Sequence, residues 1–357
     1  GDEPGDGTVD DLVDDPGRQD ARGLARRDIG ARGSHQDGMT IRRWQGKWYR
    51  WTVEAGCYRA LTDERMDVEL YSTLPIGKRS EVAEIRLALM SEPGVLIDEI
   101  ALGSWLDGPA PDGIETLDAV ACKNGIVHLP TGRVTPTTPR YFTTTALPHV
   151  FDQNPPSPKR WYGFLRQLWP SDEESIGFLQ EWMGYLLTPD IRQHKIAWLI
   201  GPPRSGKGTI GRVISDLLGG DANVAGPTLD QFGKDFGLQS LIGKLAAVIG
   251  DARLSGRTDT GPIIERLLSI SGADAQNVNR KNRDFWYGEI TTRITILSNE
   301  IPRLVDASDA LARRSIMLNL TKSFLGHEDT MLSQALIAEM PGILLGAIEG
   351  WRRLQAR

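Results

Sequence analysis

The stretch IAWLIGPPRSGKGTIGRVI, residues 196–214, decides the fold of this chain. Its first five residues are apolar, as expected of a buried strand, and from Lys207 onward apolar residues recur at helical spacing. Glycines between the two elements let main-chain N–H groups point at phosphate oxygens, and the start of a helix adds the positive end of its dipole. The stretch therefore predicts a phosphate-binding loop. Its residues are Gly201, Pro202, Pro203, Arg204, Ser205, Gly206, Lys207, Gly208 and Thr209.

Two side chains of this loop predict its chemistry. In such loops a lysine reaches the β- and γ-phosphates of a nucleotide, and a hydroxyl holds Mg²⁺. Lys207 is the expected lysine. The usual Ser or Thr directly after it is replaced by Gly208, so Thr209, one residue later, is the expected metal ligand. The order Gly-Lys-Gly-Thr also occurs in some nucleotide kinases, which keeps a kinase open as an alternative.

Two later apolar runs are followed by polar residues. Asp251 comes after the run Leu245–Ile249, and Asn299 comes after the run that begins at Ile294. A carboxylate at the carboxyl edge of a strand can bind Mg²⁺ or its water shell, which makes Asp251 the expected second metal ligand. An amide beside the γ-phosphate can orient the attacking water, which is the role expected of Asn299. The alternative is an asparagine that only forms a turn.

A double arginine precedes the last apolar strand. Arg313 and Arg314 stand directly before the run SIML. An arginine in this position can reach the γ-phosphate held by a neighbouring subunit. Paired arginines on a surface are the alternative.

A second basic cluster lies between the expected metal ligand and the expected water-orienting residue. Arg280, Lys281 and Arg283 fall within four positions, and the aromatic run of residues 285–287 follows. A basic hairpin tip can follow a phosphate backbone, and an aromatic ring can stack on a base. The cluster therefore predicts contact with DNA. The alternative is a solvated loop beside aromatic residues of the core.

The order of these segments predicts the architecture. From residue 191 onward, strand-like apolar runs alternate with helical segments, which predicts an α/β fold with a parallel central sheet over residues 191–357. Residues 39–190 predict a smaller, mostly helical α+β domain. Residues 1–38 hold ten acidic residues and five arginines, which is −5 of the net charge of −6. Few of them are apolar, so we expect a flexible acidic segment; an acidic mimic of DNA is the alternative.

Composition excludes several classes of protein. The 357 residues are 40% hydrophobic and 25% charged, which is typical of a globular chain. No apolar run approaches the ~18 residues that a membrane-spanning helix needs, so we expect no membrane partner. Two cysteines are too few for a disulfide scaffold or a zinc cluster and fit a reducing cytoplasm. The net charge neither demands nor excludes a nucleic-acid partner.

Taken in order, the motifs resemble the helicase portion of phage- and plasmid-type primase-helicases, in helicase superfamily three. The resemblance runs from roughly residue 120 to residue 357 and includes GPPRSGKGT, FGLQSLIGKLAAVIGDARLSG, IERLLSISGADAQNVNRKN and TRITILSNEIPRLVDASDALARR. The region before the phosphate loop is similar to the poxvirus-type helicase N-terminal region found in these proteins. The resemblance implies an AAA+-like P-loop ATPase that forms hexameric rings and moves on single-stranded DNA.

The resemblance also implies roles for single residues. ATP and Mg²⁺ would be the cofactors, with Lys207 and Thr209 at the phosphates and the metal, and Asp251 as the second acidic motif. Asn299 would be the sensor of the γ-phosphate. Arg314 matches the arginine finger best and Arg313 is the fallback. Lys281 matches the tip of the hairpin that contacts DNA in the pore of the ring.

The expected function is that of an ATP-dependent DNA helicase motor in a phage, prophage or plasmid replication system of a bacterial cytoplasm. We expect a homo-hexamer on single-stranded or forked DNA. No primase region precedes the motifs, so we expect no primer synthesis and a possible separate primase or origin-binding protein as partner. One alternative is a ring ATPase that loads or remodels replication proteins without unwinding. The nucleotide kinase is the other, although it has no use for the basic hairpin or the double arginine.

Overall fold

The computed structural model describes residues 20–76, 78–250, 252, 254, 258–281, 283–302, 304 and 309–357, and for Arg79, Asp112, Arg283 and Asp284 it describes the main chain alone. The chain divides into two compact units. Unit 1 comprises the described residues up to Arg50 together with Leu61–Asp98. Unit 2 comprises Trp51–Ala60 and Glu99–Arg357.

Unit 1 combines three helices with short antiparallel strands. Its elements are α1 (Ala21–Arg32), β1 (Ser34–His35), β2 (Gly38–Met39), β3 (Ile41–Trp44), most of β4 (Lys47–Thr52), α2 (Asp63–Thr73) and α3 (Arg79–Ser91). Asp20 and Thr62 cap α1 and α2, because each side chain accepts a hydrogen bond from a main-chain N–H three residues later. The core of the unit forms between the helices and the hairpin β3–β4, around Trp48, Met66 and Leu70.

Helix α1 corrects the prediction for residues 1–38. The segment was expected to be flexible as a whole, but residues 21–32 form a helix whose Leu24 and Ala25 are buried in the core of unit 1. For residues 20–38 the prediction is therefore wrong. Composition understated the apolar face of α1, because only a few apolar residues are needed when a neighbouring core completes their burial. Residues 1–19 lie outside the described part of the chain.

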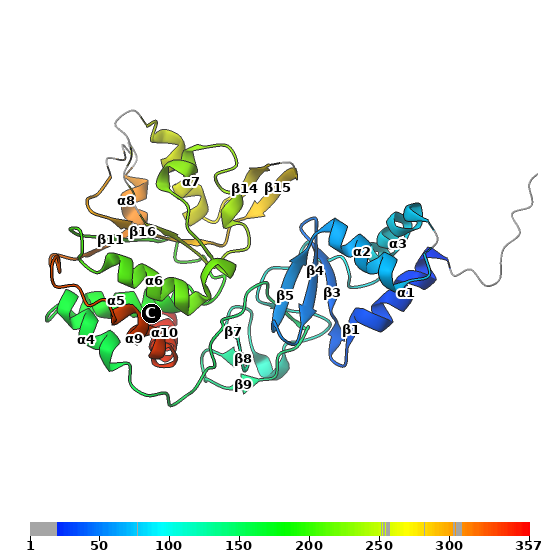
Figure 1. Cartoon of the computed structure of the whole chain (residues 1–357), viewed down its shortest axis with the longest axis horizontal. Coiled ribbons are helices and arrows are strands. Elements are labelled where there is room, and N and C mark those ends of the chain that lie inside the picture. Colours follow the sequence, from blue (N-terminus) through cyan, green and yellow to red (C-terminus); the bar gives the residue numbers. More distant parts are fainter. Residues whose placement is uncertain are drawn as a thin grey trace, which may run out of the picture. The chain divides into compact units, whose positions relative to one another are not determined.

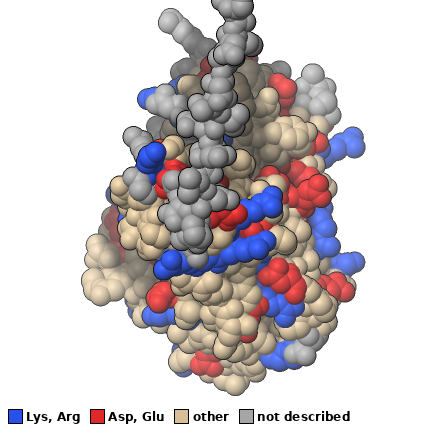
Figure 2. Space-filling model, turned by 90° about the vertical axis from the view of Figure 1, so that its right-hand side faces the viewer, with Lys and Arg blue, Asp and Glu red and all other residues tan. Residues whose placement is uncertain are grey.

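The charged side chains of unit 1 are mixed in sign. Arg26 pairs with Glu92 at 3.1 Å, and Arg86 pairs with Asp67 at 3.0 Å. The face of the molecule shown in Figure 2 likewise carries Lys and Arg interspersed with Asp and Glu. Exposed pairs of this kind contribute little to stability, about 0–1 kcal/mol each. The described charges on this face are therefore of both signs.

Unit 2 begins with small sheets and two amphipathic helices. These elements are β5 (Cys57–Leu61, except its last residue), β6 (Ser104–Trp105), the 3₁₀ turn η1 (Pro111–Gly113), β7 (Ala119–Cys122), β8 (Gly125–His128), β9 (Val134–Thr135), β10 (Tyr141–Phe142), α4 (Lys159–Leu168) and α5 (Glu173–Tyr185). Strands β7, β8 and β9 form one antiparallel sheet. Their inner side chains share a core with α4 and α5.

The rest of unit 2 is built on one parallel sheet. Its elements are β11 (Ile196–Ile200), α6 (Lys207–Leu218), η2 (Gly220–Ala222), β12 (Val224–Ala225), η3 (Leu229–Gly233), η4 (Gln239–Leu241), β13 (Ala246–Ile249), α7 (Gly261–Ser271), β14 (Ala275–Arg280), β15 (Arg283–Glu289), β16 (Arg293–Ser298), α8 (Ala310–Arg314), β17 (Ser315–Asn319), α9 (Leu332–Ala338) and α10 (Met340–Gln355). Five strands lie in the order β12-β13-β16-β11-β17, and all neighbours are parallel. The α/β class and the central parallel sheet are confirmed.

Helices cover both faces of this sheet (Figure 1). In β11, Ala197 and Leu199 face the core formed with α4, α5, α6, α9 and α10, whereas Ile196 and Trp198 face the core formed with α7 and α8. Successive side chains of a strand point to opposite faces, so a strand covered on both sides reads as one continuous apolar run. This explains why IAWLI is apolar throughout.

Helices α5 and α10 join the same core as the sheet. They cross so closely that a Cβ on Gly184 would overlap the main chain of α10, and a Cβ on Gly350 would overlap that of α5. Trp182 of α5 donates a hydrogen bond of 2.9 Å to Thr295 of β16. The predicted domain boundary after residue 190 therefore falls inside unit 2, and it stays a prediction.

Among the described residues, no single helix is long and apolar enough to cross a membrane. The pair α9 and α10 passes that test only when taken together, across a bend of 70°. Much of α10 is buried against α5, which is the position of a core helix.

Candidate active site

The predicted phosphate loop connects β11 to α6, the strand and helix that the sequence predicts around it. Gly206 caps α6 in the left-handed region, with a φ of 93°. A Cβ there would lie 3.0 Å from both Leu168 and Phe164, so glycine is required at this position on both grounds. Among the described residues, nothing accepts a hydrogen bond from the main-chain N–H groups of Ser205, Gly206 and Lys207. Free donors at a helix start form a site that suits an anion.

The Lys207 ammonium is folded back onto the loop. Its Nζ donates to Gly201 O at 2.6 Å, Pro202 O at 2.8 Å and Ser205 Oγ at 3.1 Å. It also donates to Asn299 Oδ1 at 3.2 Å. Burial lowers the pKa of the Lys207 ammonium. Lys207 and Asn299 are 92 positions apart in the chain.

Strand order explains this meeting. β11 and β16 are parallel neighbours, with Ile200 opposite Ser298, so Gly201 and Asn299 leave the sheet side by side at its carboxyl edge. Gly201 also donates from its N–H to Ser298 O at 3.2 Å. The structure thus brings together the predicted phosphate-binding lysine and the predicted water-orienting amide.

Of the two predicted metal ligands, Thr209 is among the described residues and Asp251 is not. Thr209 lies in the first turn of α6, half-buried, and its Oγ1 accepts a hydrogen bond of 3.3 Å from Arg212 Nη2. Asp251 lies outside the described residues. β13, which precedes it, is a parallel neighbour of β16, and Gly250 lines a cavity of about 290 Å³ beside α6. Gly208 and Arg212 line the same cavity.

A segment after β17 supports the loop, and sequence reasoning missed it. Leu320 N–H donates to Ile200 O at 2.7 Å, and Phe324 N–H donates to Arg204 O at 2.9 Å. Ser323 Oγ donates to Pro203 O at 2.9 Å. All three acceptors and two of the three donors are main-chain groups, which leave no mark in the sequence. Arg212 was also missed, because one arginine on a helix surface is an ordinary feature.

The double arginine lies at the opposite end of the parallel strands, where they begin; we call this the amino edge of the sheet. Arg314 donates to Leu268 O and, at 3.3 Å, to Ser271 Oγ at the end of α7. Arg313 is exposed. Because β17 runs parallel to β11, with Ser315 opposite Ile196, the pair stands at the amino edge of the sheet, away from Lys207 of the same chain.

The predicted basic cluster is the end of a two-stranded hairpin formed by β14 and β15. Val278 and Trp286 are buried, while Phe285 and Tyr287 are 64% and 73% exposed. The alternation reconciles the two interpretations of the aromatic run, because one ring packs in the core and its neighbours do not.

At the tip, Lys281 is exposed, and its main-chain N–H donates to Gln239 Oε1 at 3.0 Å. Arg280 is half-buried and has partners in the structure. The Arg283 side chain lies outside the described part. Of the three predicted DNA-binding residues, the structure therefore presents one exposed side chain, and it adds Gln239 as a support for the tip.

Comparison with known proteins gives two family matches. Residues 35–170 match the family described as D5 N terminal like, and residues 199–314 match a family of unknown function, DUF5906. No curated protein matches the chain.

Several solved structures are similar in fold. Three apo structures of the NrS-1 C terminal region have TM-scores of 0.59, 0.59 and 0.58. They are 13%, 14% and 12% identical to this chain, and each match covers 94% of this chain and 72% of the other. At these identities the similarity shows the fold alone.

The D5 N-terminal-like match falls on the region whose sequence is similar to the poxvirus-type helicase N-terminal region. The second match runs from the end of β11 to the double arginine, and so includes the phosphate loop. The two matched regions follow one another in the same order as the two regions that resemble the phage- and plasmid-type primase-helicases in sequence.

Proposed function

We propose that this chain is the ATP-driven DNA helicase motor of a phage, prophage or plasmid replication system, and that it works as a ring of identical AAA+-like subunits. The observation that carries the proposal is the contact between Lys207 Nζ and Asn299 Oδ1 at the mouth of the phosphate loop. A cation that binds the phosphates and a polar group that orients the attacking water are parts that recur together at sites that cleave a terminal phosphate.

The residues present fit ATP with Mg²⁺. The free N–H groups at the start of α6 suit phosphate oxygens, and a buried ammonium beside them adds charge. The Thr209 hydroxyl and the Asp251 carboxylate are oxygen ligands of the kind that Mg²⁺ prefers. When bound, the metal would neutralise charge on the phosphates. Lys207 would bind the phosphates, and Asn299 would orient the attacking water.

The position of the double arginine supports sharing of the nucleotide between subunits. Ile196 lies opposite Ser315 and Ile200 opposite Asn319, so the arginines and the phosphate loop are separated by about 13 Å of strand. An arginine at the amino edge therefore cannot serve the loop of its own chain, whereas it can serve the loop of a neighbour. In a ring, the amino edge of each subunit can supply an arginine to the phosphate loop at the carboxyl edge of the next subunit.

The hairpin supports DNA as the substrate. Lys281 at the tip can contact a phosphate, and the exposed rings of Phe285 and Tyr287 offer surfaces on which bases stack. Gln239 of η4 fixes the main chain at the tip, because its side-chain oxygen accepts from the Lys281 N–H.

Three assays test the proposal. ATP hydrolysis is measured with and without single-stranded DNA, release of a strand is measured on a forked duplex, and particle mass is measured with an ATP analogue and single-stranded DNA. We expect hydrolysis that DNA stimulates, release of the strand and a ring-sized particle. Lys207→Ala should abolish the first two, and Lys159→Ala, an exposed lysine of α4, is the matched control.

Other outcomes would favour the alternatives. Hydrolysis without release of the strand would favour a ring ATPase that loads or remodels other proteins. Transfer of phosphate to a nucleoside monophosphate, with no effect of DNA, would favour a nucleotide kinase.

A further inference from the structure

At the amino edge of the parallel sheet, side chains of β11 and of the residue before it hold the segment that carries the double arginine. Lys195, the residue before β11, donates from Nζ to Arg313 O at 2.7 Å. Trp198 of the same strand donates from Nε1 to Ser315 Oγ at 3.0 Å. Together with the pairing of Ile196 and Ser315, these contacts tie the end of α8 to the strand that leads into the phosphate loop.

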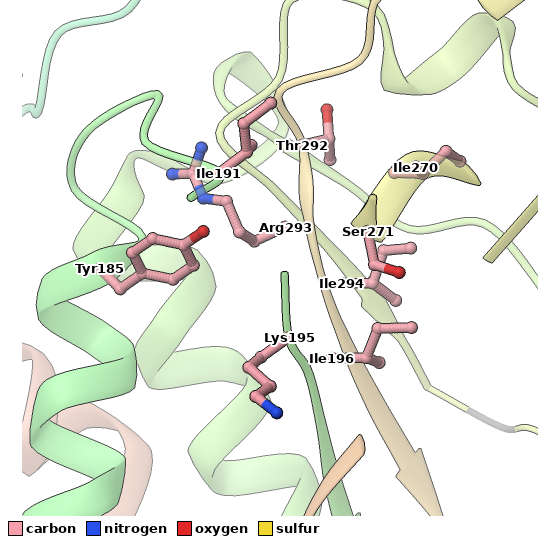
Figure 3. Close-up of a pocket in the computed structure, with 9 residues that line it drawn as sticks. All are labelled: Tyr185, Ile191, Lys195, Ile196, Ile270, Ser271, Thr292, Arg293 and Ile294. Atoms are coloured by element: carbon pink, nitrogen blue, oxygen red, sulfur yellow. The ribbon is translucent and has the colours of Figure 1, made fainter. Parts of the chain in front are cut away.

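Figure 3 shows this edge. Lys195 and Ile196 lie at the start of β11, and Ser271 at the end of α7 and Arg293 at the start of β16 lie around the same small cavity of about 10 Å³. His194 Nδ1 lies 3.0 Å from Ser271 O. The residues just before β11 therefore contact both α8 and α7.

The guanidinium of Arg314 is engaged within its own chain. It donates to the carbonyl of Leu268 and to Ser271 Oγ, and a Cβ on Gly272 would lie 2.6 Å from its Nη1. Carbonyls at the end of a helix carry partial negative charge and are stabilised by a cation. To reach another subunit, this guanidinium would have to give up its hydrogen bonds to both acceptors, which costs free energy.

Arg313 is in the opposite situation. Its side chain is exposed, and among the described residues its guanidinium makes no hydrogen bond or ion pair. Its main chain, in contrast, is fixed at both ends, because its N–H donates to Asp309 O at 3.2 Å and its carbonyl accepts from Lys195. A fixed backbone with a free guanidinium is suited to a group that acts on a second molecule.

We propose that Arg313, rather than Arg314, is the cation that each subunit lends to the terminal phosphate held by its neighbour, and that Lys195 is the residue that positions it. This inference rests on the proposed function. Lys195 connects the arginine that serves the neighbouring site to the strand that ends at the phosphate loop of its own chain.

The chemistry predicts which kinetic constant changes. Charge builds up on the terminal phosphate as its bond to the leaving oxygen breaks, so a cation delivered from the neighbour accelerates turnover more than it tightens ATP binding. Arg313→Ala should therefore lower kcat by about 10³-fold and leave the KM for ATP nearly unchanged. Lys195→Ala should lower kcat by roughly 10- to 100-fold, because it misplaces the cation without removing it.

The experiment compares four variants with the wild-type chain and with Arg27→Ala, an exposed arginine of α1. The variants are Arg313→Ala, Arg314→Ala, Lys195→Ala and Lys195→Arg, and the readouts are DNA-stimulated kcat, the KM for ATP and the thermal midpoint. We expect Arg314→Ala to lower the thermal midpoint and to reduce kcat less than Arg313→Ala does. Lys195→Arg should restore much of the kcat that Lys195→Ala loses, because a guanidinium can also donate to the Arg313 carbonyl.

Two combinations separate a positioning role from a merely structural one. Lys195→Ala should lower kcat little further in the Arg313→Ala background, because the group that it positions is already gone. Arg313→Ala subunits mixed with Lys207→Ala subunits should turn over faster than either alone. In such mixtures an intact loop from one subunit meets an intact arginine from the other.

The contrary results are distinct. If Arg313→Ala keeps wild-type kcat while Lys207→Ala abolishes hydrolysis, or if no mixture shows recovery, this inference is wrong and the proposed function stands. If Arg314→Ala removes turnover at an unchanged thermal midpoint, the roles of the two arginines are reversed. If the wild-type chain shows no hydrolysis that DNA stimulates, the proposed function fails and the inference fails with it.

Discussion

The two edges of the parallel sheet in unit 2 hold their cations in different ways. At the carboxyl edge, Lys207 lies beside main-chain N–H groups that have no acceptor among the described residues. At the amino edge, Arg293 donates to Thr291 O at 2.6 Å and to Leu186 O at 2.8 Å, and its guanidinium lies 5.5 Å from the centre of the Tyr185 ring. The first edge is arranged for a ligand, whereas at the second edge the Arg293 guanidinium has partners within its own chain and the Arg313 guanidinium has none among the described residues. The partners of a cation, rather than its presence, indicate its role.

The largest expected effect is a loss of stability when Arg293 at the amino edge is replaced. Arg293 is buried, and burial lowers the pKa of its guanidinium to about 10. Arg293→Ala would leave two carbonyls unpaired and a cavity beside Tyr185, so we expect a loss of about 3–5 kcal/mol in the free energy of unfolding. Urea unfolding measures it. Arg313→Ala is the matched control and should change stability by less than ~0.5 kcal/mol. A loss below ~1 kcal/mol for Arg293→Ala would contradict the conclusion that Arg293 stabilises the amino edge of the sheet.

The next largest effect is a loss of ATP turnover, without loss of stability, when Asn299 at the carboxyl edge is replaced. Asn299 is exposed and contacts Lys207, so Asn299→Ala should leave the thermal midpoint unchanged. If Asn299 orients the attacking water, kcat for ATP should fall by about 10²-fold, as when one preorganised polar group is removed. Asn299→Asp is the informative partner, because a carboxylate beside Lys207 would repel the phosphates and weaken ATP binding as well. Unchanged kcat in Asn299→Ala would leave Asn299 as a turn-forming residue.

A smaller effect tests an exposed cation of the hairpin. Lys281→Ala should keep basal ATP hydrolysis but lose stimulation by DNA, and the salt dependence of DNA binding should become shallower by about one unit of slope. Tyr287→Ala is a useful comparison, because loss of a stacking ring should weaken binding with little change in that slope. Binding is measured by fluorescence anisotropy over a series of salt concentrations. Normal unwinding by Lys281→Ala would contradict the assignment of the hairpin tip.

The same contrast explains what could be predicted from sequence. The strand, glycine loop and helix around Lys207 lie in one continuous stretch, so their pattern is local and the structure confirms it. Arg314 resembles an arginine finger in sequence, yet its partners are the Leu268 carbonyl and the Ser271 hydroxyl of α7, more than forty residues away. The tie from Lys195 to Arg313 O likewise requires the order of the strands to be known. Composition failed for α1, because its apolar residues are few but are buried by other parts of unit 1.

The smallest expected effect concerns two glycines of the phosphate loop and sharpens the description of the carboxyl edge. Around Gly208 the nearest atom to an added Cβ is Arg212 Nη1, at 3.8 Å, so Gly208→Ala should stabilise the ligand-free chain by about 0.5–1 kcal/mol through helix propensity. Gly206→Ala, two residues earlier, should destabilise it by about 1–3 kcal/mol, because φ is 93° and two side chains lie 3.0 Å from the new Cβ. Thermal unfolding of both variants measures the difference. Equal effects would mean that Gly206 is not held in the left-handed region, and the anion site at the start of α6 would then lose its geometric basis.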